Sequence, residues 1–476
     1  MSSTGTAVGP LDLRFTVAQQ FRPVDMIAPR FGQFDSAAET ADEPPLPSPL
    51  PPVHECFRTG QGLVAPFGAV VCEVAEQQAD SAVSAGWSTA DGDALMVHYD
   101  AFQHEVSITV TTEGVTEVVA RTPVTLRTPY RLAATLTGTR ITAVAADDGT
   151  QGWRPLVIGD SLPFVDPRRP ETLRDYRHTY GGRSARLSRV RAGYFGQVGL
   201  RDGHLVTYAD GRPYRRDGRL LFTFGAAGMG FSQEAHWSVW ALDPDAPERM
   251  EQVAKLFFTH DGLVTGDNAG QIVYDEDRDR FVIVVCGGNL PEPGVYVRHA
   301  QTSADILSGV HVIANERLAA PVDLSSWEPA IGLVDGRWHI AYANVVQLSP
   351  ELEFHPVLVA AAEDGDYHEG LTVRATDPDV RRTEGCVLHR FATGWHLLAT
   401  DDAQREYRVY DLALRQVGTL AAPFLPGGPH PQVVPLDDDD RDWLLVTFAN
   451  VQFHEDVLGY GTEGDVVIMR GHAGRG

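Results

Sequence analysis

The chain has 476 residues and a formal net charge of -25. Such an acidic balance argues against nucleic acid or an anionic membrane surface as partner, since both require a basic footprint. Glycine (46 residues) and proline (31 residues) are plentiful, which favours many short strands joined by tight turns over long helices. We therefore expect an all-β protein with room for two or more domains.

Targeting and redox signals are sparse. The first residues contain no charged segment followed by an apolar run, and no apolar stretch approaches the roughly 20 residues that a membrane helix needs. The four cysteines form no metal-type pair, and Cys286 and Cys386 stand in apolar strand patterns typical of buried free thiols. These features predict a cytoplasmic protein.

The first unit, residues 1–60, is poorly patterned and contains the proline-rich run EPPLPSPLPPV. Successive prolines lack backbone donors and cannot occupy the interior of a helix or sheet. We expect this unit to run extended over the surface as a linker or strap.

Residues 61–203 contain strands with period-two alternation, such as GAVVCEVAE, ALMVHYDAF and EVSITVTT, separated by turn residues at short spacing. This pattern predicts a β-sandwich. The unit ends in RVRAGYFGQVGLRD, which resembles the closing strand of concanavalin-like jelly-roll sandwiches. The resemblance implies a jelly-roll topology.

Residues 204–476 carry an internal repeat. A strand, a tight acidic or glycine turn and an apolar or aromatic strand recur five times, with second halves DGRLLFTFG, DRDRFVIVVCG, DGRWHIAYAN, ATGWHLLATDD and DRDWLLVTFAN. Successive turns are separated by somewhat fewer than sixty residues, and this spacing is enough for one four-stranded blade each. The repeat predicts a five-bladed β-propeller.

A polar residue stands near the start of the strand before each of these turns. These residues are Asp210, Asp267, Glu328, Glu384 and His430. The innermost strands of a propeller line its central channel, so their starts converge on one mouth. We expect the four carboxylates and the histidine to share one pocket there. For each residue taken alone, a simple turn role is the alternative.

At these positions the sequence resembles the five-bladed propeller glycoside hydrolases of family 43, with the invertase and levanase class as a relative. The resemblance implies that Asp210 is the general base, that Asp267 tunes the acid and that Glu328, in WEPAI, is the general acid. Glu328 lacks the glycine that usually follows the acid, whereas Glu384 has it (TEG), so Glu384 is a rival acid or a substrate-binding carboxylate. His430, in GGPHPQVV, matches an axial histidine near a metal ion or water cluster. The resemblance thus implies a place for a structural calcium ion on the propeller axis, while we expect no cofactor to be required.

Aromatic, amide and imidazole side chains suited to sugar contacts flank the expected mouth. They are His236, Trp237, Asn268, Gln271 and Trp327. Glycosidic cleavage needs one carboxylic acid to protonate the leaving oxygen and a carboxylate on the opposite face, and crowding of carboxylates raises the pKa of the acid. We expect a glycosidase or transglycosylase that acts on a small furanoside-type glycoside.

The alternatives are a non-catalytic carbohydrate-binding propeller protein and a propeller lyase or isomerase. The departures from the family motifs favour the first alternative, while four carboxylates at matching positions favour the enzyme. A small carbohydrate is the expected partner in the two main interpretations, and homo-oligomer formation stays open.

Overall fold

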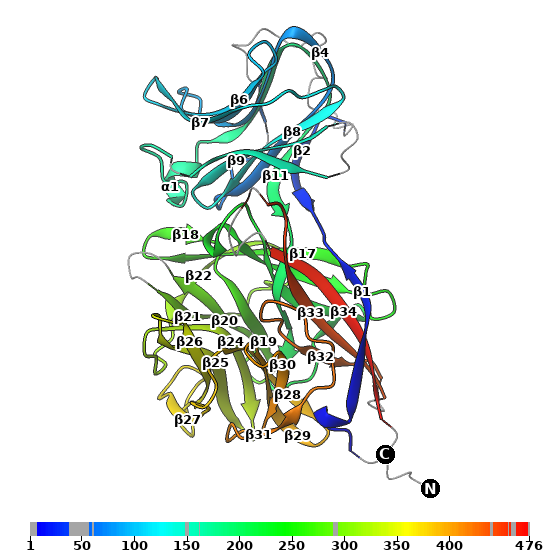
Figure 1. Cartoon of the computed structure of the whole chain (residues 1–476). Coiled ribbons are helices and arrows are strands. Elements are labelled where there is room, and N and C mark those ends of the chain that lie inside the picture. Colours follow the sequence, from blue (N-terminus) through cyan, green and yellow to red (C-terminus); the bar gives the residue numbers. More distant parts are fainter. Residues whose placement is uncertain are drawn as a thin grey trace.

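The computed structural model describes residues 7–37, 57–59, 61–147, 152–160, 162–288, 294–437, 441–455, 457 and 463–474. This part of the chain is nearly all strand, with one short helix, α1 (Pro170–Leu173), and two 3-10 turns, η1 (Pro10–Asp12) and η2 (Ser232–Glu234). Among the described residues, no helix has the length and apolar character of a membrane span. The strands form two parts, stacked one above the other in Figure 1.

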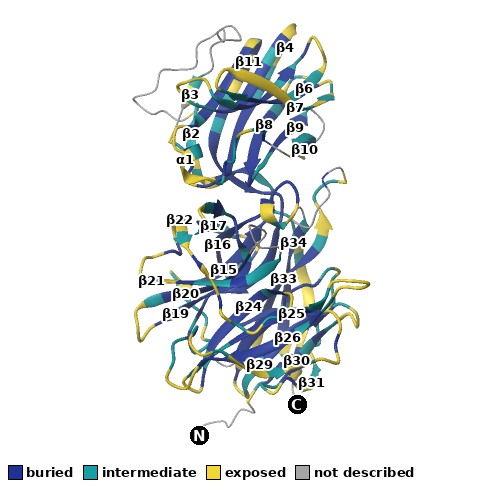
Figure 2. Ribbon diagram, turned by 90° about the vertical axis from the view of Figure 1, so that its left-hand side faces the viewer, coloured by how far each residue is buried: buried dark blue, intermediate teal, exposed yellow. Residues whose placement is uncertain are grey.

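The upper part is a ten-stranded antiparallel sheet with the order β10-β9-β8-β4-β5-β6-β7, in which β11 pairs with β2, β3 and β4. Its strands are β2 (Asp25–Asp35), β3 (Phe57–Thr59), β4 (Phe67–Ser88), β5 (Ala94–Asp100), β6 (Glu105–Thr112), β7 (Val115–Pro123), β8 (Tyr130–Thr137), β9 (Arg140–Asp147), β10 (Arg154–Gly159) and β11 (Arg177–Gln197). The alternating apolar residues form one buried core, seen as dark blue strands in Figure 2.

The lower part consists of five smaller sheets in a propeller-like arrangement, in which at least four act as blades. The first sheet contains β12 (Leu200–Leu205), β14 (Arg215–Arg216), β15 (Arg219–Ala226), β16 (His236–Leu242), β17 (Glu251–His260), β18 (Leu263–Thr265) and β22 (Gly309–Ala314). The second contains β13 (Thr207–Tyr208), β19 (Asn268–Asp275), β20 (Arg280–Gly288), β21 (Val295–Thr302) and β23 (Glu316–Arg317).

The remaining three sheets have four strands each. The third contains β24 (Ser325–Val334), β25 (Arg337–Gln347), β26 (Glu353–Ala360) and β27 (Thr372–Thr376). The fourth contains β28 (Thr383–Phe391), β29 (Gly394–Asp401), β30 (Glu406–Tyr410) and β31 (Gln416–Thr419). The fifth contains β1 (Leu13–Phe21), β32 (Gln432–Pro435), β33 (Asp442–Gln452) and β34 (Glu463–Ala473).

Tight turns join the hairpins that the repeat predicts. Asp217 and Gly218 have φ angles of 51° and 78°, and Asp335 and Gly336 have φ angles of 48° and 82°. Two successive positive φ angles define the hairpin turn for which Asp-Gly is a preferred pair. Each of the five repeated second halves contributes the second strand of a hairpin, namely β15, β20, β25, β29 and β33.

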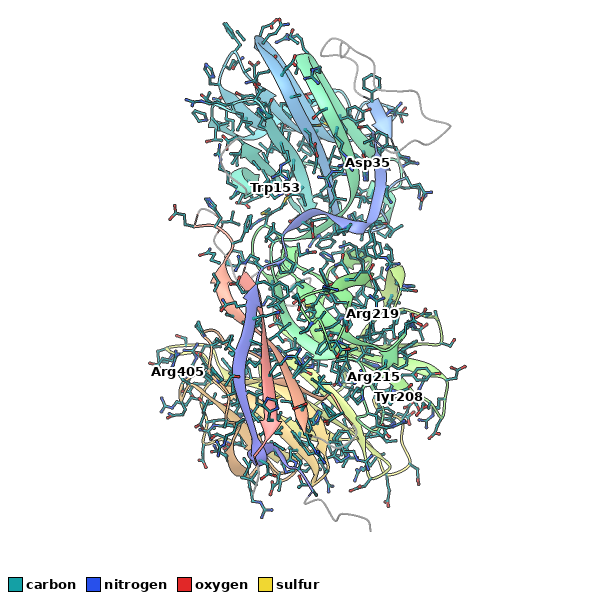
Figure 3. The ribbon with its side chains drawn as sticks, turned by 90° about the vertical axis from the view of Figure 1, so that its right-hand side faces the viewer. Asp35, Trp153, Tyr208, Arg215, Arg219 and Arg405 are labelled. Atoms are coloured by element: carbon teal, nitrogen blue, oxygen red, sulfur yellow. The ribbon has the colours of Figure 1, made fainter. Side chains whose placement is uncertain are left out.

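The N-terminal unit contains strands that its sequence did not reveal. β1 pairs with β34 in the lower part, and β2 pairs with β11 in the upper part. The blue ribbon in Figure 3 therefore passes alongside both parts. The proline-rich run at 43–53 lies outside the described residues.

A second link between the two parts is a buried polar group that we call the junction cluster, formed by Asp25, Gln197, His236 and Lys255. Lys255 Nζ donates to the Phe195 carbonyl (2.6 Å) and lies 2.7 Å from His236 Nε2. Burial holds the pKa of Lys255 and that of His236 well below their usual values and raises the pKa of Asp25. Gln197 Nε2 donates to Asp25 Oδ2 (3.2 Å), so the cluster joins β2, β11, β16 and β17.

Candidate active site

The first strands of four lower sheets share one irregularity. β12, β19, β24 and β28 each contain a register shift within the hairpin pairing. Inside each shift one residue has a positive φ: Asp202 (50°), Ala269 (55°), Glu328 (54°) and Gly385 (66°). Bulges of this kind re-aim a side chain, and non-glycine residues held in this region concentrate at functional sites.

Two of these residues meet a histidine in what we call the axial cluster: Asp202, Glu328, Glu384 and His430. His430 Nε2 lies 3.2 Å from Glu328 Oε2 and 3.7 Å from Asp202 Oδ1, and these three residues are almost fully buried. Burial alone would lower the pKa of His430, but the charge and hydrogen bond of Glu328 and the charge of Asp202 raise it above the usual value. Arg201 Nε donates to Asp202 Oδ2 (2.9 Å).

Glu384 is the partly exposed member of the axial cluster. Trp327 Nε1 donates to Glu384 Oε2 (3.1 Å). Burial, followed by the charges of Glu328 and Asp202, raises the pKa of Glu384 well above its usual value. Like charges in a confined site oppose a further ionisation, so the protonated form of Glu384 is favoured.

Backbone contacts fix Glu328 in its left-handed conformation. Glu328 N–H donates to Cys286 Sγ (2.9 Å), and Gly385 N–H donates to Glu328 Oε2 (2.6 Å). Burial raises the pKa of the Cys286 thiol well above its usual value, so it stays a neutral acceptor. Three sheets therefore meet around one carboxylate.

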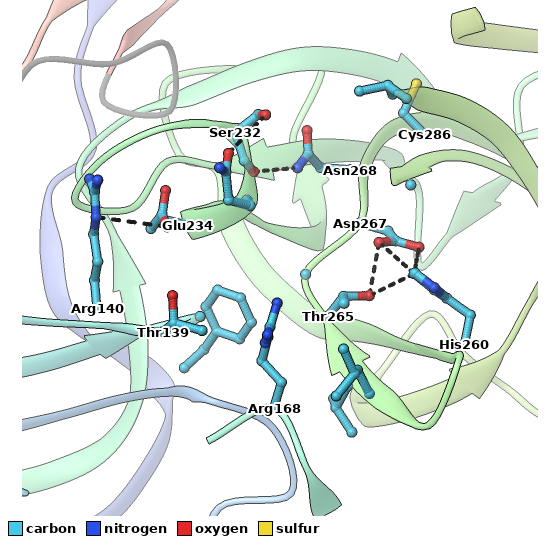
Figure 4. Close-up of a pocket in the computed structure, with 18 of the residues that line it drawn as sticks. Thr139, Arg140, Arg168, Ser232, Glu234, His260, Thr265, Asp267, Asn268 and Cys286 are labelled. Carbon is cyan, nitrogen blue, oxygen red and sulfur yellow. Dashed lines mark hydrogen bonds and ion pairs between the residues drawn. The ribbon is translucent and has the colours of Figure 1, made fainter. Parts of the chain in front are cut away.

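A cavity of about 410 Å³ adjoins the axial cluster through Cys286, which lines it. Asp267 and Asn268, at the start of β19, line the same cavity (Figure 4). Asp267 accepts hydrogen bonds from Thr265 Oγ1 (2.8 Å) and Asn315 Nδ2 (2.9 Å). The volume falls within the roughly 300–1,000 Å³ of small-molecule sites.

Three residues of the axial cluster could together hold the expected metal ion. One ligand atom each from Asp202, Glu328 and His430 lies within 4.8 Å of the other two. Asp202 Oδ1 has no hydrogen-bond partner within the described residues, which fits a cation at this point. The imidazole nitrogen makes the set closer to that of a transition metal than to the all-oxygen set that calcium prefers.

Asp210, the expected general base, lies outside the axial cluster. It follows β13 in an exposed turn, where Arg212 Nε donates to its Oδ2 (2.7 Å) and Arg390 lies 4.0 Å away. The spacing to the Asp217 turn had pointed to Asp210. After β12, however, the chain leaves the first sheet to pair as β13 with β19, which lengthens the first hairpin.

Three of the expected sugar-binding residues are structural. His236 is fully buried against Phe67 and Phe257, and Trp237 is buried in the core of the first blade. Gln271 accepts a hydrogen bond from Ile331 N–H (2.9 Å), which ties β19 to β24. Of the other two, Asn268 lines the cavity and Trp327 contacts Glu384.

Asp202 takes the place in the first sheet that we had expected for Asp210. It stands in LRDGHL and is the last residue of the phrase attributed to the sandwich. The available signal was an acidic residue followed directly by glycine, which is also found at Glu384-Gly385. The domain boundary drawn at residue 203 concealed it.

No family model and no curated protein matches the chain. Similar solved structures include a GH43_1 enzyme from Xanthomonas citri (TM-score 0.40, 12% identity, 56% of this chain and 87% of that chain). A levansucrase from B. megaterium has a TM-score of 0.40 at 9% identity over 57% of this chain and 82% of that chain. A galectin from Caenorhabditis elegans has a TM-score of 0.23 at 14% identity over 30% and 94%.

Proposed function

We propose that the chain is a glycoside hydrolase or transglycosylase that acts by acid/base catalysis at the axial cluster. The observation that carries the proposal is the convergence of three carboxyl groups whose environments differ. Glu384 has a raised pKa, whereas Asp202 is bound by Arg201 and Glu328 by His430 and a backbone N–H. Carboxyl groups with such different surroundings are the basis of acid and base assignments in glycosidases.

Glu384 is the proton donor in this mechanism. Its partial exposure lets it reach a leaving-group oxygen, and Trp327 Nε1 holds one of its oxygens. Asp202 or Glu328 supplies the carboxylate that activates water or attacks the anomeric carbon. The family resemblance had assigned the acid to Glu328, and the environment of Glu384 favours the rival assignment.

The remaining expectations extend this proposal. The fifth sheet, closed by β1, completes a five-bladed propeller, and the ten-stranded sheet is a jelly-roll sandwich. The substrate is a small furanoside-type glycoside. Asp202, Glu328 and His430 would hold a metal ion on the axis, which would fix the positions of the two carboxylates.

One observation favours a non-catalytic carbohydrate-binding protein instead. Ala269 occupies the bulge position of the second sheet, so this sheet supplies no carboxylate at the level of Asp202 and Glu328. A mouth that has lost one acidic group can still bind a sugar without cleaving it.

Hydrolysis of 4-nitrophenyl furanosides and pyranosides of arabinose, xylose, galactose and fructose tests the proposal. The parent should release nitrophenol from at least one glycoside. Glu384→Gln should lower kcat by about 10²–10⁴-fold on the methyl glycoside of the same sugar, which has a poor leaving group, and by less on the nitrophenyl glycoside, because an amide cannot donate the proton.

Glu363→Gln is the matched control, since Glu363 is exposed in the turn after β26. It should leave kcat unchanged. Sugar binding without release of nitrophenol by the parent would instead support the non-catalytic function.

A further inference from the structure

The cavity beside the axial cluster has two walls that come from different parts of the molecule. The propeller-like part supplies η2, the β17–β18 hairpin and the start of β19. The ten-stranded sheet supplies Thr139 in the β8–β9 turn, Arg140, and Arg168 in the loop before α1. Figure 4 shows these side chains facing those of the propeller-like part across the cavity.

Direct bonds hold the upper wall in place. Val264 N–H donates to the Arg168 carbonyl (2.7 Å), and Arg140 Nη1 donates to the Met229 carbonyl (3.2 Å). Arg140 Nε also lies 2.7 Å from Asp160 and 3.8 Å from Glu234. These bonds make the upper wall a fixed part of the cavity in the folded protein.

Arg168 is the side chain of this wall that is best placed to meet a ligand. Its Nε and Nη2 donate to the two oxygens of Asp166, each at 2.9 Å. This bidentate pair fixes the plane of the guanidinium, which points into the cavity in Figure 4. Amide and hydroxyl groups of Asn268 and Thr265 lie on the opposite wall.

Each charged side chain that lines the cavity has an oppositely charged neighbour. Arg140 and Arg168 each have an acidic partner, and Asp267 lies 3.4 Å from His260. A lining of paired charges, amides and hydroxyls suits a neutral ligand rich in hydroxyl groups, since each hydroxyl can both donate and accept.

We infer that this cavity binds a neutral mono- or disaccharide, and that the wall from the ten-stranded sheet restricts the adjoining axial cluster to small glycosides and chain ends. The assignment of a sugar rests on the proposed function. The observation specific to the inference is that Thr139 and Arg168 close the cavity from the upper part, so a polysaccharide cannot run across it on that side.

The test measures binding of D-xylose, L-arabinose, D-galactose, D-fructose and their disaccharides to Glu384→Gln protein by isothermal titration calorimetry. At least one sugar should bind. In that background Arg168→Ala should weaken binding about tenfold or more, because it removes a charged donor. Thr139→Trp should abolish binding by filling the cavity.

Two controls accompany these variants. Arg169→Ala alters the neighbouring arginine, whose side chain is 59% exposed and outside the lining. Thr116→Trp places the same indole on exposed β7. Both should bind as the parent does, and thermal unfolding should show all four variants folded.

The outcomes separate this inference from the proposed function. Sugar binding that survives both Arg168→Ala and Thr139→Trp overturns the inference, even if the parent cleaves a nitrophenyl glycoside. Absence of binding by every sugar tested also overturns the inference. Binding that is lost in both variants, with no turnover in the parent, supports the cavity and contradicts the enzyme.

Discussion

The axial cluster and the junction cluster are both buried polar groups with a histidine at the centre, yet they respond to burial in opposite ways. In the junction cluster, burial lowers the pKa of His236 and of Lys255 and raises that of Asp25, so each group tends to its neutral form. In the axial cluster, Glu328 and Asp202 raise the pKa of His430 against the effect of burial.

The difference lies in what surrounds each histidine. His236 packs among the rings of Phe67, Phe195 and Phe257, with Lys255 as its polar neighbour. His430 faces two carboxylates whose backbones are held in the left-handed region. Neutral buried groups that bond to one another hold a structure together, whereas concentrated charge on a strained backbone is typical of a working site.

The largest expected effect comes from neutralising the axial carboxylates. At least one of the two variants Asp202→Asn and Glu328→Gln should lower kcat on the best nitrophenyl glycoside by about 10²–10⁴-fold, because the amide cannot act as base or nucleophile. Asp210→Asn, at the exposed turn, should leave kcat unchanged. Steady-state kinetics measure kcat for these variants. A loss of activity in Asp210→Asn would contradict the placement of catalysis at the axial cluster.

A smaller effect, on stability alone, is expected at the junction. Lys255→Met removes the donor to the Phe195 carbonyl and leaves buried acceptors unpaired. The free energy of unfolding should fall by about 1–3 kcal/mol in urea titrations, while kcat of the folded protein stays unchanged. Arg249→Met, at a side chain that is 79% exposed, is the control. Unchanged stability of Lys255→Met together with a loss of turnover would show that the junction cluster contributes to catalysis.

The smallest effect concerns pH. The folded pKa of His236 lies below its unfolded value of about 6.5, so its contribution to stability is present above pH 6.5 and is lost as pH falls. His260, at the cavity, behaves oppositely. Burial lowers its pKa, but Asp267 and Asp261 raise it overall, so its contribution is full below pH 6.5 and is lost as pH rises through the folded pKa.

Urea unfolding at pH 5.5 and 7.5 distinguishes the two histidines. His236→Phe should reduce the loss of stability on acidification, and His260→Asn should increase it. Equal slopes in parent and variants would show that neither histidine changes its protonation on folding.

Sequence periodicity and turn chemistry were sufficient to predict most of the lower part. Asp217-Gly218 and Asp335-Gly336 mark hairpins because this pair accepts two positive φ angles at little cost. The long-range pairing of β1 with β34 has no local signal. Its partner lies more than 440 residues away, and no turn in the sequence specifies their register.

The candidate site was predicted where the repeat is regular and missed where it is not. Glu328, Glu384 and His430 stand at the expected positions, since β24 and β28 lead directly into their turns. The first hairpin is lengthened by β13 and β14, so spacing pointed to Asp210 and not to Asp202. Arg168 and Thr139 could not be found by spacing, because docking of the two parts brings them to the cavity.

The pairing of β1 with β34 also sets an order of events during synthesis. Residues 13–21 leave the ribosome well before their partner, residues 463–473. At 5–20 residues per second the first strand waits roughly 20–90 s with its backbone groups unpaired. The ten-stranded sheet can form during that interval, because its last strand, β11, ends at Gln197. The fifth sheet is therefore completed after the strands of the ten-stranded sheet have been made, and a nascent chain exposes β1 until then.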